Sequence, residues 1–274
     1  MNTALTIAGS DCSGGAGIQA DLKTFAAHKV YGMSAITALT AQNTLGVTGI
    51  SESSPEFLKA QLDAIFTDIY PDAVKIGMVA SKELIETIAD SLIIYKAKNI
   101  VLDPVMVSTS GSRLIKEDAA EVLKERLMVL ADVITPNTTE LAILADKKCE
   151  NVFNEAWVND YQNIEISLNT LYKQGIKRIV VTGFKEDDLI SNIVFDNGII
   201  SKVSSQKVGG YFSGTGDVFA SVLTGSLLNG NSLVDSCKKA GDFISNTIKV
   251  TNVADGNDGI SFEKTLKELI SYEK

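Results

Sequence analysis

The residues of this chain that are best suited to chemistry form the stretch Gly214-Thr215-Gly216-Asp217. An apolar pattern with helical spacing follows over 218–228, so the stretch is expected to be a loop that turns into a helix. Glycines allow several backbone N–H groups to converge on one point, and the positive end of the helix dipole adds to their attraction for an anion. The stretch therefore predicts an anion-binding site.

Asp217 is the member of this stretch whose role has two interpretations. An acid in the first turn of a helix usually complements the helix dipole or caps the helix. A phosphate repels a neighbouring carboxylate, however, which instead favours a base that accepts the proton of an attacking hydroxyl. The residue type alone leaves both interpretations open.

A second glycine-rich segment, Ser-Gly-Gly-Ala-Gly at 13–17, follows an apolar run at 4–8 and precedes an amphipathic pattern at 18–26. This order predicts a strand, a loop and a helix. The segment lacks the Gly-Lys-Ser/Thr ending of a Walker loop, and its GGxG spacing is a weak match to the dinucleotide fingerprint. The two glycine loops are better explained as opposite walls of one site, one for a small substrate and the other for phosphates.

The rest of the chain alternates short apolar strands with helices. This alternation predicts one α/β domain over 1–274, with a mainly parallel central sheet, helices on both faces and a small edge flap near 28–50. Ligands of such sheets bind at the carboxyl ends of the strands. The expected strands are 4–8, 30–39, 47–50, 73–76, 100–102, 133–134, 179–181, 190–195 and 199–203, and the expected helices are 18–26, 55–66, 82–96, 116–128, 138–145, 164–174, 218–228, 231–250 and 261–272.

Asp103 and Glu140 stand at two of the expected strand ends, beside Pro104 and Asn137. Acids and amides in such places are common helix caps. As a pair, the two carboxylates could also hold Mg²⁺, because this ion keeps part of its hydration shell and takes only one or two carboxylates. The residues therefore indicate either two caps or a magnesium site.

The composition speaks against several classes of function. A formal net charge of −9 without clustered Lys or Arg argues against a nucleic-acid partner. Three separated cysteines indicate neither a disulfide framework nor a zinc site, and the single histidine, His28, is expected to be a solvated cation at a helix end. The first residues lack a leader pattern, and no apolar run approaches the roughly 18 residues of a membrane span, so a cytoplasmic protein without a membrane partner is expected.

A series of motifs gives the chain a family resemblance. The segments Ala-Gly-Ser-Asp at 8–11 and Ser-Gly-Gly-Ala-Gly-Ile-Gln-Ala-Asp-Leu-Lys-Thr-Phe at 13–25 resemble the N-terminal signature of the hydroxymethylpyrimidine and phosphomethylpyrimidine kinases of thiamine biosynthesis, which belong to the ribokinase-like superfamily. The similarity covers nearly the whole chain. It continues through 31–34, 36–44, 75–78, 102–106 and 135–137 with Glu140.

The resemblance implies a ribokinase-like three-layer sandwich that uses ATP and Mg²⁺ to phosphorylate the hydroxymethyl group of 4-amino-5-hydroxymethyl-2-methylpyrimidine. The partner molecule would be this small heterocyclic alcohol, and we expect a homodimer. The implied roles are Gly9, Asp21, Gln42, Met78 and Val105 at the substrate ring, Asn137, Glu140, Thr182 and Gly183 at the nucleotide, Asp103 and Glu140 at the metal, Gly214, Thr215 and Gly216 around the transferring phosphoryl group, and Asp217 as the catalytic base.

Two positions depart from the pyrimidine kinase pattern. That group usually has His-Gly-Thr-Gly-Cys where this chain has Ser213 to Asp217, and a late Lys-Gly pair where this chain has Val181-Thr182-Gly183. Both departures resemble pyridoxal kinases, so a pyridoxal kinase with the same chemistry is the alternative. Gln42 favours the pyrimidine, because its amide would pair with the ring. A non-catalytic pyrimidine sensor is a further alternative, which the acid at Asp217 opposes. Whether the monophosphate is also phosphorylated stays open.

Overall fold

A computed structural model of the chain describes residues 1–43, 45–106, 117–145, 154–207 and 214–250. Within these ranges the strands form one sheet in the order β3-β2-β1-β4-β5-β6-β7-β8-β9. The bounds are β1 (Thr3–Asp11), β2 (Tyr31–Asn43), β3 (Gly46–Glu52), β4 (Ala73–Ile76), β5 (Ile100–Leu102), β6 (Val133–Ile134), β7 (Arg178–Glu186), β8 (Leu189–Asp196) and β9 (Ile199–Gln206). Strands β2, β1, β4, β5, β6 and β7 pair in parallel. The edges, β3 on one side and β8 with β9 on the other, are antiparallel.

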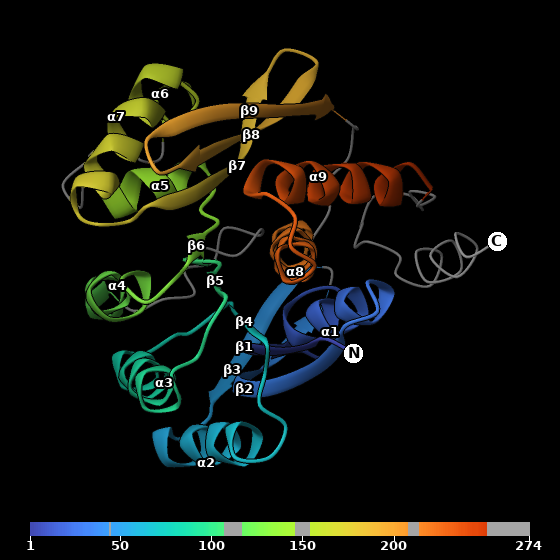
Figure 1. Cartoon of the computed structure of the whole chain (residues 1–274), viewed down its shortest axis with the longest axis vertical. Helices are drawn as coiled ribbons and strands as arrows, with labels where there is room; N and C mark the ends of the chain where they lie inside the picture. The colour runs from blue at the N-terminus through green and yellow to red at the C-terminus, as the bar shows by residue number, and fades with distance from the viewer. Residues whose placement is uncertain (44, 107–116, 146–153, 208–213, 251–274) are drawn as a thin grey trace.

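Helices cover both faces of this sheet (Figure 1). Helices α1, α8 and α9 lie on one face, and α2 to α7 lie on the other. The bounds are α1 (Gly17–Ala27), α2 (Pro55–Phe66), α3 (Lys82–Tyr95), α4 (Glu117–Val122), α5 (Thr138–Ala145), α6 (Glu155–Val158), α7 (Tyr161–Lys173), α8 (Thr215–Leu228) and α9 (Leu233–Val250), and a π-helical segment, Leu123–Met128, continues α4. The three-layer α/β sandwich expected from the sequence is confirmed.

The central strands are apolar throughout because they are buried on both faces. In β5, Ile100 and Leu102 pack into the core under α3, whereas Val101 between them packs against α8. Neighbouring side chains of a strand point to opposite faces, so one short strand supplies both cores. Strands β4, β5 and β6 have the bounds that the sequence predicts.

Long-range pairing accounts for the elements that the sequence placed less well. Strand β2 extends to Asn43, beyond the expected end at residue 39, because its last residues pair with β3. The segment near 28–50 is therefore part of the main sheet. The late hairpin is confirmed, and Asn197 and Gly198 at its turn have φ values of 50° and 92°. The helix expected over 261–272, like the loop residues 209–213, lies outside the described residues.

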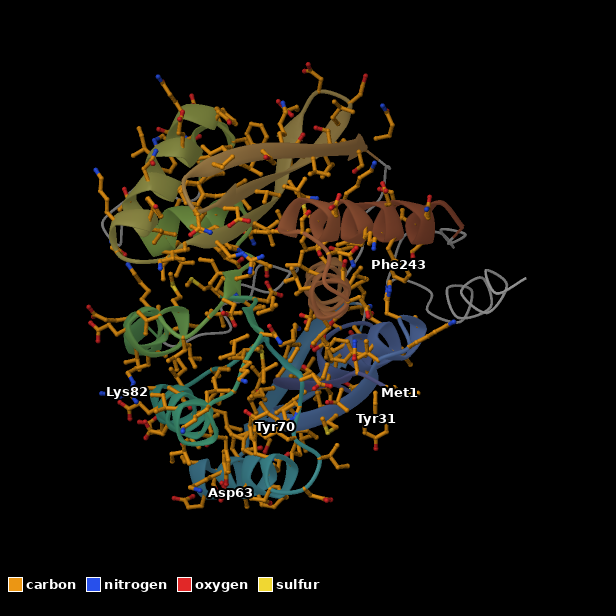
Figure 2. The ribbon with its side chains drawn as sticks, in the orientation of Figure 1. Met1, Tyr31, Asp63, Tyr70, Lys82 and Phe243 are labelled. Carbon is orange, nitrogen blue, oxygen red and sulfur yellow. The ribbon has the colours of Figure 1, made fainter. Side chains whose placement is uncertain are left out.

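His28 differs from its expected role as a solvated cation. It caps the C-terminus of α1, and its ring lies 5.1 Å from that of Phe243 on α9. Phe243 is labelled in Figure 2. Its Nε2 atom is buried without a hydrogen-bond partner among the described residues. Burial, and secondarily the charge of Lys239, lower the pKa of His28 below 6.5. The histidine is therefore neutral in the folded protein at pH 7.

This lowered pKa predicts a loss of stability in acid. An unfolded chain takes up a proton at His28 near pH 6.5, whereas the folded chain resists it, so stability falls as the pH drops through that value. We expect His28→Leu to lose less Tm than the wild type between pH 8 and pH 5.5. A difference of 1 kcal/mol corresponds to about 2–4 °C in a protein of this size. The chain has one histidine, so equal losses in the two proteins would contradict the assignment.

Candidate active site

The predicted site residues gather at the carboxyl ends of the parallel strands. The first residue after a strand is hydrogen-bonded to the end of the neighbouring strand. The N–H of Asp103 donates to Ile76 O (2.8 Å), and that of Thr135 donates to Leu102 O (2.9 Å). Farther along, the N–H of Thr182 donates to Pro136 O (2.9 Å). The residues that follow β4, β5 and β6, together with Thr182 in β7, therefore line one edge of the sheet, which we call the rim.

The anion loop begins at Gly214, which is the N-cap of α8 and has a φ of 79°. The first bond within the helix runs from the N–H of Val218 to the Gly214 carbonyl (3.0 Å). The N–H groups of Thr215, Gly216 and Asp217 precede that bond and point out of the helix end, as in any first turn. A helix end of this kind is suited to a phosphoryl group.

Gly214 also touches the other glycine loop. A Cβ atom at this position would lie 1.9 Å from the carbonyl oxygen of Gly15. The loop that contains Gly15 is itself held by the buried Asp11 carboxylate, which accepts the N–H groups of Ser13 (2.9 Å), Gly15 (3.0 Å) and Ala16 (2.9 Å). The two glycine loops therefore form adjoining walls, and their contact leaves no space for a side chain at Gly214.

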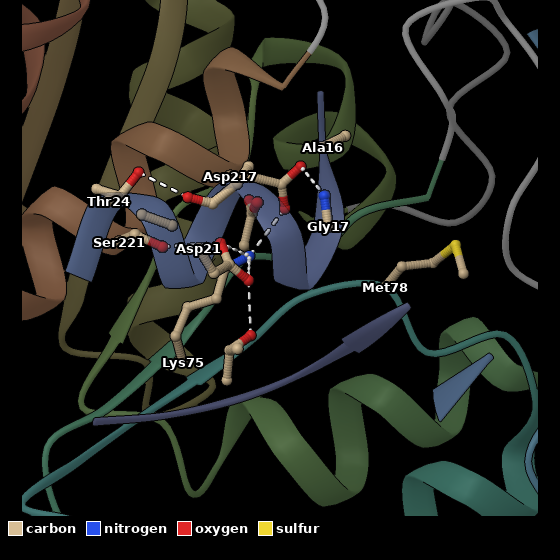
Figure 3. Close-up of polar contacts among 12 residues, drawn as sticks. Ala16, Gly17, Asp21, Thr24, Lys75, Met78, Asp217 and Ser221 are labelled. Atoms are coloured by element: carbon tan, nitrogen blue, oxygen red, sulfur yellow. Dashed lines mark hydrogen bonds and ion pairs between the residues drawn. The ribbon is translucent and has the colours of Figure 1, made fainter. Parts of the chain in front are cut away.

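Asp217 does not cap its own helix. Its Oδ2 accepts a hydrogen bond from the backbone N–H of Gly17 at the start of α1 (3.0 Å), and its Oδ1 accepts one from Lys75 Nζ in β4 (2.9 Å) (Figure 3). The side chain is 17% exposed. Each carboxylate oxygen accepts one hydrogen bond from these two partners and keeps a further lone pair. This arrangement fits the interpretation of Asp217 as a base better than that of a capping residue.

Asp21 lies in a different place from the one that the resemblance implied. Its side chain has no exposed surface, and it is enclosed by Thr6 Oγ1 (2.6 Å), Ser221 Oγ (2.8 Å) and Lys75 Nζ. A carboxylate without exposed surface cannot touch a substrate ring. The expectation of a substrate contact at Asp21 is therefore corrected: this acid lies beneath the site.

Lys75 is the functional candidate that sequence reasoning missed. It occupies the middle of β4, whose other residues are apolar, and its side chain is fully buried. A lysine is almost never fully buried unless it is paired with an acid. A lone cation inside a four-residue buried strand was therefore a usable signal of a buried ion pair.

The other residues expected at the substrate ring lie near the carboxyl ends of β1, β2, β4 and β5. A Cβ on Gly9 would lie 2.6 Å from Met78 Cε, so a side chain there would push the end of the methionine away from β1. Gln42 is half-buried near the end of β2, where its Oε1 accepts the Thr40 hydroxyl (3.2 Å). Val105, in the loop after β5, is half-buried as well.

Asn137 and Glu140 form a reciprocal cap at the start of α5. Glu140 donates its N–H to Asn137 Oδ1 (2.8 Å), and its own Oε2 accepts the Asn137 N–H (2.9 Å). This is a capping box, with asparagine in the place of serine or threonine. The capping interpretation of Glu140 is thus correct in geometry. Its Oε1 also accepts the Met106 N–H (3.2 Å), so each carboxylate oxygen keeps one lone pair for a ligand.

Asp103 and Glu140 are both buried, and they influence each other electrostatically. Asp103 Oδ1 accepts the Thr135 hydroxyl (3.1 Å), and its Oδ2 lies 3.7 Å from where a Cβ on Gly216 would stand. Burial raises the pKa of both acids above the usual carboxyl range, and the charge of Asp103 raises that of Glu140 further. A cation beside the anion loop would relieve this repulsion.

This donor set fits Mg²⁺. Among the described residues, no group of three or more His, Cys, Asp and Glu side chains is placed to hold a metal. Mg²⁺ needs no such cage, because it commonly takes one or two carboxylates together with waters and substrate phosphates. Two buried, mutually repelling carboxylates next to a phosphate loop are consistent with that mode.

Thr182 and Gly183 lie in β7, beside Asn137. Thr182 pairs with Asn137 as a parallel bridge, and Gly183 has a φ of 74° with no atom within 4 Å of the point where a Cβ would stand. The N–H of Gly183 donates to Asn192 Oδ1 (3.3 Å). The two residues thus form an open irregularity within β7, beside the Asn137–Glu140 cap, where a nucleotide could lie.

An anion loop, an adjacent carboxylate and a pair of buried acids are together suited to one chemistry, the transfer of a phosphoryl group to a small alcohol. On this α/β sandwich they define a ribokinase-like small-molecule kinase. Comparison with known proteins names the family: the chain belongs to the phosphomethylpyrimidine kinase family, whose model matches residues 11–261.

Individual relatives cover almost the whole chain. The hydroxymethylpyrimidine/phosphomethylpyrimidine kinase of Haemophilus influenzae is 40% identical over 250 residues, which are 89% of this chain and 90% of that protein. The crystal structure of the Clostridium difficile phosphomethylpyrimidine kinase matches with a TM-score of 0.76 and 38% identity, over 90% of this chain and 100% of that one. The pyridoxal kinase of Staphylococcus aureus in complex with pyridoxal has a TM-score of 0.83 but 27% identity, over 96% of this chain and 93% of that one.

Proposed function

We propose that this kinase transfers the γ-phosphoryl group of ATP to the hydroxymethyl group of 4-amino-5-hydroxymethyl-2-methylpyrimidine, and then phosphorylates the resulting monophosphate. The observation that carries the choice of substrate is the 40% identity to a relative named for both pyrimidine steps, over nine-tenths of the chain. The pyridoxal kinase resembles this chain closely in backbone structure, with a TM-score of 0.83, but less closely in sequence, with 27% identity. Side chains rather than the backbone choose the substrate, so we place the pyridoxal kinase second.

In the proposed reaction the substrate hydroxyl oxygen attacks the γ-phosphorus of ATP. A new phosphorus–oxygen bond forms, the bond from the γ-phosphorus to the bridging oxygen breaks, and ADP leaves. Asp217 accepts the hydroxyl proton through a free lone pair, and the N–H groups at the start of α8 stabilise the charge on the transferring group. Mg²⁺, held by Asp103 and Glu140, would neutralise phosphate charge. Gly9, Met78, Val105 and Gln42 would surround the ring.

Two expectations about the whole protein stay predictions. A homodimer and a cytoplasmic location belong to the proposal. None of the helices that the structure describes is long and apolar enough to cross a membrane.

A substrate panel tests this function. We expect ADP release with Mg²⁺ and ATP to show the highest kcat/KM for the hydroxymethylpyrimidine, a measurable rate for its monophosphate, and lower values for pyridoxal. Mass spectrometry of the products confirms the added phosphate. A higher kcat/KM for pyridoxal than for the pyrimidine would overturn the choice of substrate.

The variant Gln42→Ala sharpens the panel. Loss of a polar partner of the ring costs about 1–3 kcal/mol, which is roughly 5- to 150-fold in kcat/KM for the pyrimidine. The exposed Gln174→Ala is the matched control and should behave as the wild type. An equal loss on the pyrimidine and on pyridoxal would argue against an amide that reads the pyrimidine ring.

A further inference from the structure

Lys75 lies between two carboxylates below the anion loop (Figure 3). Its Nζ is 2.9 Å from Asp21 Oδ1 and 2.9 Å from Asp217 Oδ1. The Lys75 and Asp21 side chains have no exposed surface, whereas that of Asp217 is 17% exposed. The buried lysine therefore joins an enclosed acid to the acid that faces the site.

The enclosed end of this chain of contacts is fixed from several elements. Asp21 on α1 accepts the hydroxyl of Thr6 in β1 (2.6 Å) and that of Ser221 in α8 (2.8 Å). With Lys75 Nζ as a third donor, its carboxylate has no freedom to turn. Lys75 is thus anchored on one side by a rigid counter-ion, and its remaining contact is with Asp217.

Lys75 cannot act on a ligand directly. Its ammonium has no surface from which to reach a phosphate. Burial alone would lower its pKa, but the facing carboxylates of Asp21, Asp217 and Asp103 raise it well above the ordinary value. The lysine stays charged at every pH at which the enzyme works, so its contribution is a fixed position and a fixed charge.

We propose that Lys75 is a positioning residue of the phosphoryl transfer, and that Asp21 is its buried counter-ion rather than a substrate ligand. Lys75 holds Oδ1 of Asp217 from below while the Gly17 N–H holds Oδ2, and the two contacts fix the plane of the carboxylate. The free lone pairs of Asp217 then face the entering hydroxyl. This inference rests on the proposed role of Asp217 as the base.

Gly77 supports this arrangement. A Cβ at Gly77 would lie 2.9 Å from Lys75 Nζ and 3.1 Å from the Cβ of Ala8. The lysine therefore reaches Asp217 through a space that only glycine leaves open. A methyl group there would displace the end of the Lys75 side chain without removing any charge.

The test compares a charge-balanced double variant with the wild type. Lys75→Met alone would leave the Asp21 charge buried and unpaired, so Lys75→Met/Asp21→Asn removes both charges at similar shape. We expect a folded protein whose KM for ATP stays within about twofold. Its kcat should fall about 10²-fold, the cost of misplacing a reacting group by roughly 1 Å. The exposed pair Lys82 and Glu86 supplies the control, Lys82→Met/Glu86→Gln, which should retain wild-type kinetics.

The split between kcat and the KM for ATP separates positioning from mere stability. Asp217 faces Lys75 from α8, with Asp21 on α1 and Asp103 after β5 as the other charges around the lysine. The double variant removes the contact that holds Asp217 Oδ1, so kcat should fall while the KM for ATP stays near the wild-type value. A purely structural role would lower Tm and leave the kcat of the folded protein unchanged.

Three outcomes decide the matter. A folded double variant with wild-type kcat overturns the inference. If Asp217→Asn is fully active, Asp217 is not the base. That result contradicts the proposed function and is distinct from the failure of the Lys75 inference. If the double variant does not fold, Gly77→Ala takes its place: a reduced kcat with unchanged KM for ATP supports Lys75 as a positioning residue, and wild-type kcat overturns it.

Discussion

Asp217→Asn is expected to lower kcat by roughly 10²–10⁴-fold, the usual contribution of a general base. Asparagine keeps nearly the shape of aspartate, but its one carbonyl oxygen can accept only one of the Gly17 and Lys75 hydrogen bonds, and its amide cannot take up the hydroxyl proton. The KM for ATP should change little, because the carboxylate is directed toward Gly17 and Lys75. Steady-state kinetics with the pyrimidine and with ATP as the varied substrates measure both quantities.

The control for this variant is the same exchange at an exposed acid. Asp68 lies on the surface after α2, and Asp68→Asn should leave kcat unchanged. Lys75 keeps its contact with Asp21 in the Asp217→Asn protein, so the variant should still fold, with a Tm below that of the wild type because the buried lysine loses one of its two counter-ions. An active, folded Asp217→Asn enzyme would remove Asp217 from the mechanism.

Gly214→Ala is expected to have the second large effect. The residue has a φ of 79°, and an added Cβ would meet the Gly15 carbonyl oxygen at 1.9 Å. Backbone atoms of both loops must move apart to admit it, which would turn the N–H groups of the anion loop away from the phosphoryl group. Loss of one such donor costs about 10²–10³-fold in kcat, and we expect at least that.

Gly230→Ala separates backbone strain from the clash. Gly230, after α8, has a φ of 77° and no atom within 4 Å of an added Cβ. Alanine at either position carries the strain of a left-handed backbone, about 1–2 kcal/mol, but only Gly214→Ala adds the collision. We expect both variants to lose Tm and only Gly214→Ala to lose kcat. A similar kcat in the two variants would show that the contact between the loops is dispensable.

Local sequence signals predicted most of the fold. Apolar runs gave the bounds of β4, β5 and β6, and Pro55 marked the start of α2, where Ser54 Oγ accepts the Phe57 N–H. The short helix α6 was not predicted, because its four residues are too few to show a helical period. The excess length of β2 depends on a partner strand that local patterns do not reveal.

The site was predictable where a residue type fits only one kind of place. The glycines of the anion loop predicted an anion site, whereas the residue type of Asp217 left its role open, and the structure places Gly216 next to Asp103. Asp21 and Lys75 were not predictable in this way, since their roles follow from a contact between residues 54 positions apart. Family resemblance placed Asp21 at the substrate, whereas its burial places it beneath the base.

The contact between Gly15 and Gly214 limits how this site can be re-engineered. The two loops belong to opposite ends of the chain, yet each forms part of the surface against which the other folds. Loops exchanged with a related kinase should therefore be exchanged as a matched pair, since a foreign substrate loop meets a phosphate loop that was shaped by a different partner. We therefore expect substrate preference and phosphate handling to be transferable together rather than one loop at a time.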